Sequence, residues 1–187
     1  MSQEEFRASQ ENIKTTEERA IRVGMEVEKN LMLAEQVVLE LKTKGLYITT
    51  VESCTGGGLA YYITNIPGAS DIMKDSVVTY SNEAKIALGV PAEIINQFTV
   101  YSKETAEAMA MAGLQKSVRA DIGIGITGSI SRIDPNNPNS QPGKIYIAIQ
   151  YKDKKITKEL DVVAESRFDV KQKIIEESLL LVLEVIK

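Results

Sequence analysis

The sequence contains no histidine and no tryptophan, and its single cysteine is Cys54. The lack of histidine excludes Ser-His-Asp and Cys-His catalysis, together with every metal site that depends on imidazole. One cysteine excludes an intramolecular disulfide and a cysteine-rich zinc or iron–sulfur site. If the protein is an enzyme, proton transfer therefore falls to lysine, tyrosine, aspartate or glutamate. Its nucleophile is then serine, threonine, lysine or Cys54.

Long apolar runs and an excess of positive charge are also missing. No stretch approaches the roughly 20 apolar residues that span a bilayer. The acidic segment 1–20 resembles neither a signal peptide nor a transit peptide. The net charge of −4 argues against a dedicated nucleic-acid binder. Since 43% of the 187 residues are apolar, the chain can bury a core. We expect a cytoplasmic protein with neither a membrane nor a nucleic-acid partner.

The patterns that are present alternate between helix and strand. Apolar residues spaced by three, four or seven predict a helix over 25–44, and segment 1–24 is expected to be a helical or flexible extension. That extension is either a solvated helix or an arm that mediates assembly. Strands are predicted over 47–51, 76–80, 121–127, 144–151 and 156–163, and helices over 59–66, 82–88, 91–98, 102–118 and 166–186. This order predicts an α/β fold with a mixed, mostly parallel sheet and an antiparallel edge.

Two motifs resemble binding sites but fail in context. Residues 123–128 match G-x-G-x-x-G, yet the glycines lie inside a predicted strand and a proline-containing loop follows, so we reject a dinucleotide site. These glycines are expected instead to let a helix or a ligand approach the strand closely. Asp134, Asn136 and Asn139 lack the glycine and glutamate that complete a calcium loop. They predict a cluster of Asx turns.

The segment after the first predicted strand, Glu52-Ser-Cys-Thr-Gly-Gly-Gly58, is more informative. These small residues form a turn, and a helix follows whose first N–H groups can hold an anion or a developing oxyanion. The alternative is a turn that needs glycine for its geometry, with Ser53 capping the helix. Cys54 is expected to be a small buried hydrophobe, because nothing nearby activates its thiol.

A second polar segment, Thr79 to Lys85, also runs from a strand end into a helix. If both strand ends face one edge of the sheet, Ser53, Tyr80 and Lys85 converge there. In a protein without histidine, lysine is a plausible base for a serine, provided that its environment lowers the lysine pKa. The alternative is a solvated Lys85 and a Tyr80 that packs in the core.

Five stretches together resemble the CinA C-terminal domain family, the nicotinamide mononucleotide deamidases also called PncC. They are VESCTGGGLAYYITNIPGAS, VVTYSNEAKIALGVP, the helix from Ser102 to Ala110, ADIGIGITG and PGKIYIA, in the family's order over residues 30–180. The resemblance implies a three-layer α/β/α sandwich over 25–187. It also implies a homo-oligomer that hydrolyses nicotinamide mononucleotide to nicotinate mononucleotide and ammonia in NAD recycling, with no metal or cofactor.

Carried onto this chain, the resemblance makes Ser53 the nucleophile, Lys85 the general base and Tyr80 a proton relay. Backbone N–H groups of residues 55–57 are expected to hold the oxyanion. The substrate-binding residues that it implies are Thr55, Gly56, Gly57, Asn82, Thr127, Gly128 and Arg167, the last near the phosphate and accompanied more weakly by Lys171.

The chain departs from the family after Thr127-Gly128, where a glycine-rich loop is replaced by residues 129–135, SISRIDP. Arg132 in this loop either contacts the substrate phosphate or belongs to a segment that occludes the pocket. Glu165 and Ser166 also replace the first two residues of the family's G-D-R motif. Two other functions stay open: a catalytically silent homologue that binds a nucleotide or a protein partner, and an amidase for another small amide.

Overall fold

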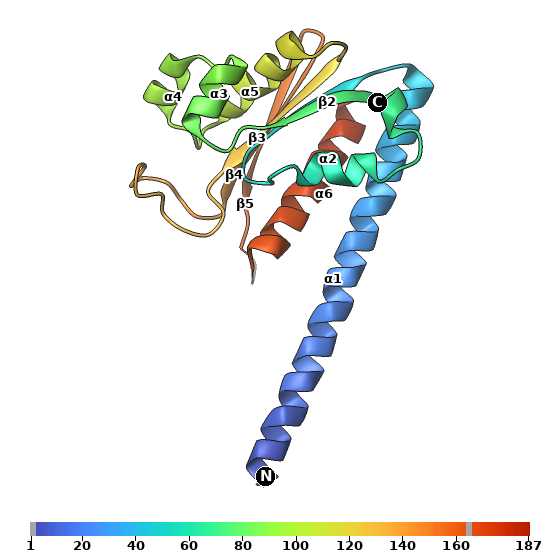
Figure 1. Cartoon of the computed structure of the whole chain (residues 1–187), viewed down its shortest axis with the longest axis vertical. Coiled ribbons are helices and arrows are strands. Elements are labelled where there is room, and N and C mark those ends of the chain that lie inside the picture. Colours follow the sequence, from blue (N-terminus) through green and yellow to red (C-terminus); the bar gives the residue numbers. More distant parts are fainter. Residues whose placement is uncertain (1–2, 164–165) are drawn as a thin grey trace.

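A five-stranded sheet with helices on both faces forms the body of the protein (Figure 1). The computed structural model describes residues 3–163 and 166–187, with side chains described from residue 15 onward. The strands are β1 (Ile48–Glu52), β2 (Met73–Val78), β3 (Ile122–Gly128), β4 (Lys144–Tyr151) and β5 (Lys154–Asp161), in the order β2-β1-β3-β4-β5. The predicted α/β class and the mixed sheet are confirmed.

The strand directions decide where the chain can build a site. Strands β2, β1 and β3 run parallel, whereas β4 pairs antiparallel with β3 and with β5. Glu52, the last residue of β1, pairs with Val78, the last residue of β2, and with Ile126 of β3. The residues after β1 and β2 therefore emerge side by side at one edge, where open α/β sheets bind their ligands.

In the described part of the chain, six α-helices cover the sheet and complete three layers (Figure 1). One face of the sheet is covered by α1 (Gln3–Lys44), α2 (Gly58–Thr64) and α6 (Arg167–Val185). The other face is covered by α3 (Asn82–Leu88), α4 (Ala92–Phe98) and α5 (Lys103–Lys116). A short 3₁₀ helix, η1 (Ala69–Asp71), precedes β2. The larger apolar core lies between the sheet and the α1–α2–α6 layer.

Helix α5 packs directly on the backbone of β3. A Cβ atom on Gly123 would lie 2.3 Å from the carbonyl oxygen of Ala110, and one on Gly125 only 2.0 Å from that of Ala106. Neither contact is possible for a real side chain, so these two positions require glycine. The G-x-G pattern thus allows a helix to pack closely on a strand. The sequence predicts that either a helix or a ligand approaches the strand at these glycines.

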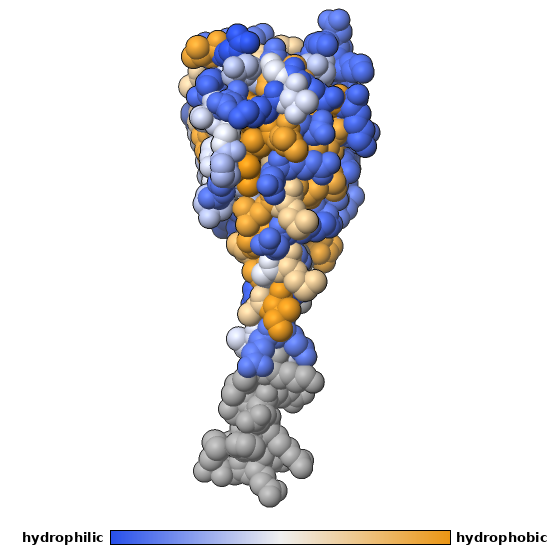
Figure 2. All heavy atoms as spheres, turned by 90° about the vertical axis from the view of Figure 1, so that its right-hand side faces the viewer, coloured by the Kyte–Doolittle hydropathy of each residue, from blue (hydrophilic) through white to orange (hydrophobic). Residues whose placement is uncertain are grey.

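Helix α1 is continuous through the expected boundary near residue 24 and projects beyond the sandwich at its N-terminal end (Figure 1). Ala34, Val37 and Leu41 are buried against the domain. Four large apolar side chains on α1 are instead between 62% and 69% exposed: Ile21, Met25, Met32 and Leu39. In Figure 2 apolar atoms continue from the body onto the projecting helix. Within the described chain, no helix is both long and apolar enough to cross a bilayer.

Strand β2 begins and ends earlier than the predicted 76–80, at Met73 and Val78. Its polar start is possible because the Asp75 carboxylate accepts hydrogen bonds from Thr49 at 2.6 Å and from Ser117 at 2.7 Å. The N–H of Thr79 still donates to the Glu52 carbonyl at 2.7 Å. Tyr80 therefore lies beyond the strand, in the turn that leads to α3.

Candidate active site

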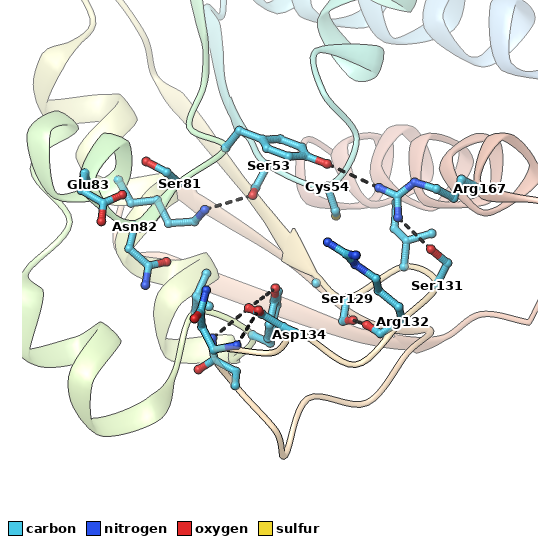
Figure 3. Close-up of a pocket in the computed structure, with 18 residues that line it drawn as sticks. Ser53, Cys54, Ser81, Asn82, Glu83, Ser129, Ser131, Arg132, Asp134 and Arg167 are labelled. Atoms are coloured by element: carbon cyan, nitrogen blue, oxygen red, sulfur yellow. Dashed lines mark hydrogen bonds between the residues drawn. The ribbon is translucent and has the colours of Figure 1, made fainter.

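A pocket of about 660 Å³ opens at the edge where β1 and β2 end (Figure 3). Its walls come from the turn after β1, the start of α3, the loop between β3 and β4, and the first residue of α6. Among the residues that the sequence singled out, those that line it are Ser53, Cys54, Tyr80, Asn82, Lys85, Gly128, Arg132, Asp134, Asn136 and Arg167. The volume is in the range of small-molecule sites.

Ser53 and Lys85 form the centre of this pocket. The Lys85 Nζ donates to the Ser53 Oγ at 3.0 Å and to the Thr79 carbonyl oxygen at 2.8 Å. Lys85 is only 1% exposed although it belongs to the short surface helix α3. Its side chain thus extends from α3 to Ser53, and the two strand ends meet through this contact. A nucleophile and a base within hydrogen-bond distance form the basic unit of covalent amide hydrolysis.

Burial changes the acidity of Lys85 in the direction that this chemistry needs. Removal of the ammonium from water lowers the pKa of Lys85 from 10.5 to about 8. No carboxylate lies within ion-pair distance of it among the described side chains, so no partner reverses that shift. A substantial fraction of Lys85 is therefore neutral near physiological pH.

Tyr80 lies on the rim of the pocket and is 66% exposed. Its hydroxyl accepts a hydrogen bond from Arg167 at 3.4 Å, and the same guanidinium donates to Ser131 Oγ at 2.9 Å. In the described part of the chain, no hydrogen bond joins Tyr80 to Ser53 or Lys85. The structure thus brings Tyr80 to the site but directs its hydroxyl toward Arg167.

The glycine-rich turn leads into a helix whose N-terminus binds a buried carboxylate of the protein itself. Glu52, which is fully buried, accepts hydrogen bonds from the N–H groups of Leu59 and Ala60, at 3.1 and 2.9 Å. The N–H of Gly56 donates to the Ser53 carbonyl at 3.0 Å. A protein carboxylate therefore already occupies the N-terminus of α2. The residues 55–57 that were expected to bind substrate and oxyanion do not line the pocket.

Two further expected residues also lie away from the pocket wall. Thr127 is buried, and its hydroxyl donates to the Val100 carbonyl at 2.7 Å, which ties β3 to the start of α5. Lys171 on α6 lies behind the turn, where its Nζ would be 3.2 Å from a Cβ atom on Gly56. Neither residue is among those that face the cavity.

Cys54 lines the pocket, but its burial disfavours the thiolate form. The side chain is 5% exposed within the apolar core, and burial raises the pKa of the Cys54 thiol to about 12. A thiol with this pKa contains almost no thiolate at neutral pH. Cys54 therefore packs as a small hydrophobe, as the sequence indicated.

Sequence reasoning missed the contact that fastens the loop between β3 and β4. The Tyr101 hydroxyl donates to the Asp134 carboxylate at 2.9 Å, and Asp134 also accepts from the N–H of Asn136 and from the amide of Asn137. The predicted Asx turn is thus present at Asp134. The only sequence signal for the longer contact is the position of Tyr101, next to the capping residue Ser102 of α5.

Comparison with known proteins places the chain in a family. The model of the CinA C-terminal domain matches residues 30–186. A CinA-like protein of Kosmotoga olearia is 40% identical over 131 residues, covering 70% of this chain and 31% of the relative. A putative competence-damage inducible protein of Clostridium botulinum is 36% identical over 168 residues, or 82% of this chain and 41% of the relative. The chain thus spans less than half of these curated relatives.

Solved structures agree with this assignment. The competence/damage inducible protein CihA from Agrobacterium tumefaciens superposes with a TM-score of 0.78 at 27% identity, over 85% of this chain and 96% of that one. A competence or damage-inducible protein from Enterobacter asburiae gives a TM-score of 0.76 at 28% identity, over 84% and 98% of the two chains. With a matching domain model and the same three-layer architecture, the chain belongs to the CinA C-terminal domain family.

Proposed function

We propose that the protein is an amidohydrolase that uses Ser53 as nucleophile and Lys85 as general base. The observation that carries the proposal is the 3.0 Å contact between Lys85 Nζ and Ser53 Oγ, made by a lysine whose burial lowers its pKa to about 8. Ser–Lys pairs of this kind replace the serine–histidine pair in several unrelated hydrolases.

In the proposed reaction, neutral Lys85 takes the proton of Ser53 while Oγ attacks the carbonyl carbon of a bound amide. Lys85 then returns the proton to the departing nitrogen, so that ammonia leaves and an acyl-serine remains. Water hydrolyses this ester with Lys85 again as base. Among the small residues after Ser53, only Cys54 lines the pocket, so we assign the backbone donor to the oxyanion to residue 54. Tyr80 stands at the rim, where it can contact the substrate.

The proposed substrate is nicotinamide mononucleotide, which family resemblance suggests and which this pocket suits chemically. Its pyridinium charge lowers the pKa of a neighbouring lysine further, so the bound substrate favours the reactive form of Lys85. Its phosphate carries negative charge, which the guanidinium of Arg167 at the rim can bind. The protein would then act in recycling of NAD in the cytoplasm.

The substrate proposal is tested by ammonia release from purified protein on a panel of amides. We expect nicotinamide mononucleotide to be hydrolysed with a higher kcat/KM than nicotinamide riboside or nicotinamide. Preference for a different amide would keep the Ser53 chemistry and reject this substrate. Tight binding of the mononucleotide without hydrolysis would favour a catalytically silent homologue.

We also propose that the protein forms a homo-oligomer. The exposed apolar side chains of Ile21, Met25, Met32 and Leu39, which follow one another on α1 at spacings of four and seven residues, support this, because exposed apolar side chains gathered on one face mark interaction sites. Light scattering of the full chain should give a mass above that of one 20.6 kDa chain. A monomer at all concentrations would refute the assembly.

A further inference from the structure

The loop that replaces the family's glycine-rich segment brings an extra arginine into the pocket. Arg132 lines the cavity, and in Figure 3 its guanidinium points from the loop into the interior, on the side where Ser53 and Cys54 lie. Among the described side chains, Arg132 forms neither a salt bridge nor a side-chain hydrogen bond. An arginine that faces a cavity without a salt bridge is suited to bind an anionic ligand group, although the charge of Arg132 also helps to lower the pKa of Asp134.

A second guanidinium faces the same space from α6. Among the described residues, Arg167 donates to two neutral hydroxyls, the Oγ of Ser131 and the hydroxyl of Tyr80. Ser131 precedes Arg132 in the loop, so this contact holds the two arginines on neighbouring parts of the wall. Two guanidinium groups that form no salt bridge with the described residues place positive charge at this end of the pocket, opposite Glu83 and Asn82 on α3, although the Asp134 carboxylate also lines the pocket.

The loop that carries Arg132 is fixed at its base. The Ser129 Oγ donates to the Arg132 carbonyl at 2.8 Å, and the N–H of Gly143 donates to the Ser129 carbonyl at 2.7 Å. These contacts close the loop onto the end of the β3–β4 ladder. The carbonyl of Arg132 is therefore tied to the base of the loop, while the residue as a whole stays exposed at the pocket wall.

The far side of the loop is fastened by Tyr101 and Asp134. Burial and the bonded carboxylate raise the pKa of Tyr101 to about 12, whereas the donors around Asp134 hold its pKa below the usual value. The hydroxyl therefore stays protonated and the carboxylate ionised throughout the neutral range, so the 2.9 Å hydrogen bond persists. Three donors, from Tyr101, Asn136 and Asn137, also offset the negative charge of Asp134 within the pocket.

We propose that Arg132 binds the phosphate of the substrate and that Tyr101, through Asp134, is a positioning residue for Arg132. This inference rests on the proposed function for the identity of the nucleotide but concerns a residue that the family's own loop does not supply. It makes the altered loop a determinant of specificity for phosphorylated ligands. Phosphate is the preferred partner of a guanidinium because two N–H groups pair with two oxygens.

The test measures binding separately from hydrolysis. Calorimetry on the Ser53→Ala protein gives the Kd of nicotinamide mononucleotide and of nicotinamide riboside, which differ only in the phosphate. Adding Arg132→Gln should weaken mononucleotide binding about tenfold or more, the size of a lost charged hydrogen bond. Riboside binding should change less than about twofold, and Arg119→Gln, a remote guanidinium over Tyr47, should change neither.

Tyr101→Phe then separates positioning from a merely structural role. The substitution should weaken mononucleotide binding by roughly threefold to tenfold. In the Arg132→Gln background it should cause no further loss of affinity, because Tyr101 acts through that arginine. Equal loss for both ligands, additive effects, or tighter binding after Arg132→Gln would overturn the proposal. So would a mononucleotide that does not bind. A wild type that binds phosphate through Arg132 but releases no ammonia would reject only the proposed amidase activity.

Discussion

The Nζ of Lys85 lies 3.0 Å from the Oγ of Ser53, although the two residues are 32 positions apart in the sequence and belong to different elements, Ser53 to the turn after β1 and Lys85 to α3. The contact exists because β1 and β2 are parallel neighbours that end at the same level. The turn after β1 presents the serine, and the helix after β2 sends its lysine inward. The reactive pair is thus a consequence of sheet topology.

The pH dependence of the reaction should reflect Lys85. A base must be neutral, and the pKa of Lys85 is about 8, so kcat/KM should rise with pH and level off above about pH 8. With a pyridinium substrate bound, the midpoint of the kcat profile should lie lower than that of kcat/KM. Initial rates between pH 6 and 10 measure both profiles. A rate that falls across this range would exclude neutral Lys85 as the base.

Lys85→Met should stabilise the protein at pH 7 while abolishing its activity. The lowered pKa means that folding disfavours the protonated lysine, by about 3 kcal/mol as an upper bound for the shift from 10.5 to about 8. The two lost hydrogen bonds offset part of this gain, which leaves about 1–2 kcal/mol. Urea unfolding of both proteins gives the difference.

The pH dependence of this difference follows from the sign of the shift. Between about pH 8 and 10.5 the unfolded chain binds a proton at Lys85 that the folded chain does not, so wild-type stability rises with pH relative to the variant. The advantage of Lys85→Met should therefore shrink above pH 8. An advantage that grew with pH would show that the folded-state pKa is raised instead.

Cys54→Ala should leave catalysis intact. The thiol beside the nucleophile is buried with a pKa raised to about 12, so it cannot supply a thiolate at neutral pH. We expect kcat/KM to stay within about twofold of wild type, and the native protein to resist iodoacetamide until it is unfolded. Loss of activity with retained fold would show that Cys54, and not Ser53, is the nucleophile.

Gly125→Ala should destabilise the fold strongly, because its Cβ would lie 2.0 Å from the Ala106 carbonyl oxygen. We expect a loss of about 3 kcal/mol or more in urea unfolding. Gly24→Ala is the matched control: its Cβ meets nothing within 4 Å on α1, so it should stabilise by about 0.5–1 kcal/mol. Similar effects at both positions would contradict the close packing of α5 on β3.

The sequence allowed the main parts of the site to be predicted because strand ends carry local signals. The β-branched run before Ser53 and the polar segment from Thr79 to Lys85 identified two ends that could face one edge. The early start of β2 was not predictable, since the contacts that satisfy Asp75 come from Thr49 and Ser117. Such long-range hydrogen bonds leave no periodic pattern in a single sequence.

The contact between Glu52 and the start of α2 was not predicted, for the same reason. Glu52 is the last residue of a strand, and nothing in the sequence at that position indicates that its carboxylate will accept hydrogen bonds from the N–H groups of Leu59 and Ala60. That contact fills the helix N-terminus that the sequence suggested for an anion. The pairing of Tyr101 with Asp134 likewise depends on how the loop folds back onto the start of α5.

The central claim is that Ser53 and Lys85 act as one unit in amide hydrolysis, and ammonia release from nicotinamide mononucleotide tests it most directly. Ser53→Ala and Lys85→Met should each lower kcat/KM by at least about a thousandfold, and the double variant should lower it little further. Lys85→Arg should also fail because its guanidinium stays charged, whereas Lys154→Met, on the exposed surface, should match wild type. Release that survives either single substitution at a near wild-type rate would contradict the account.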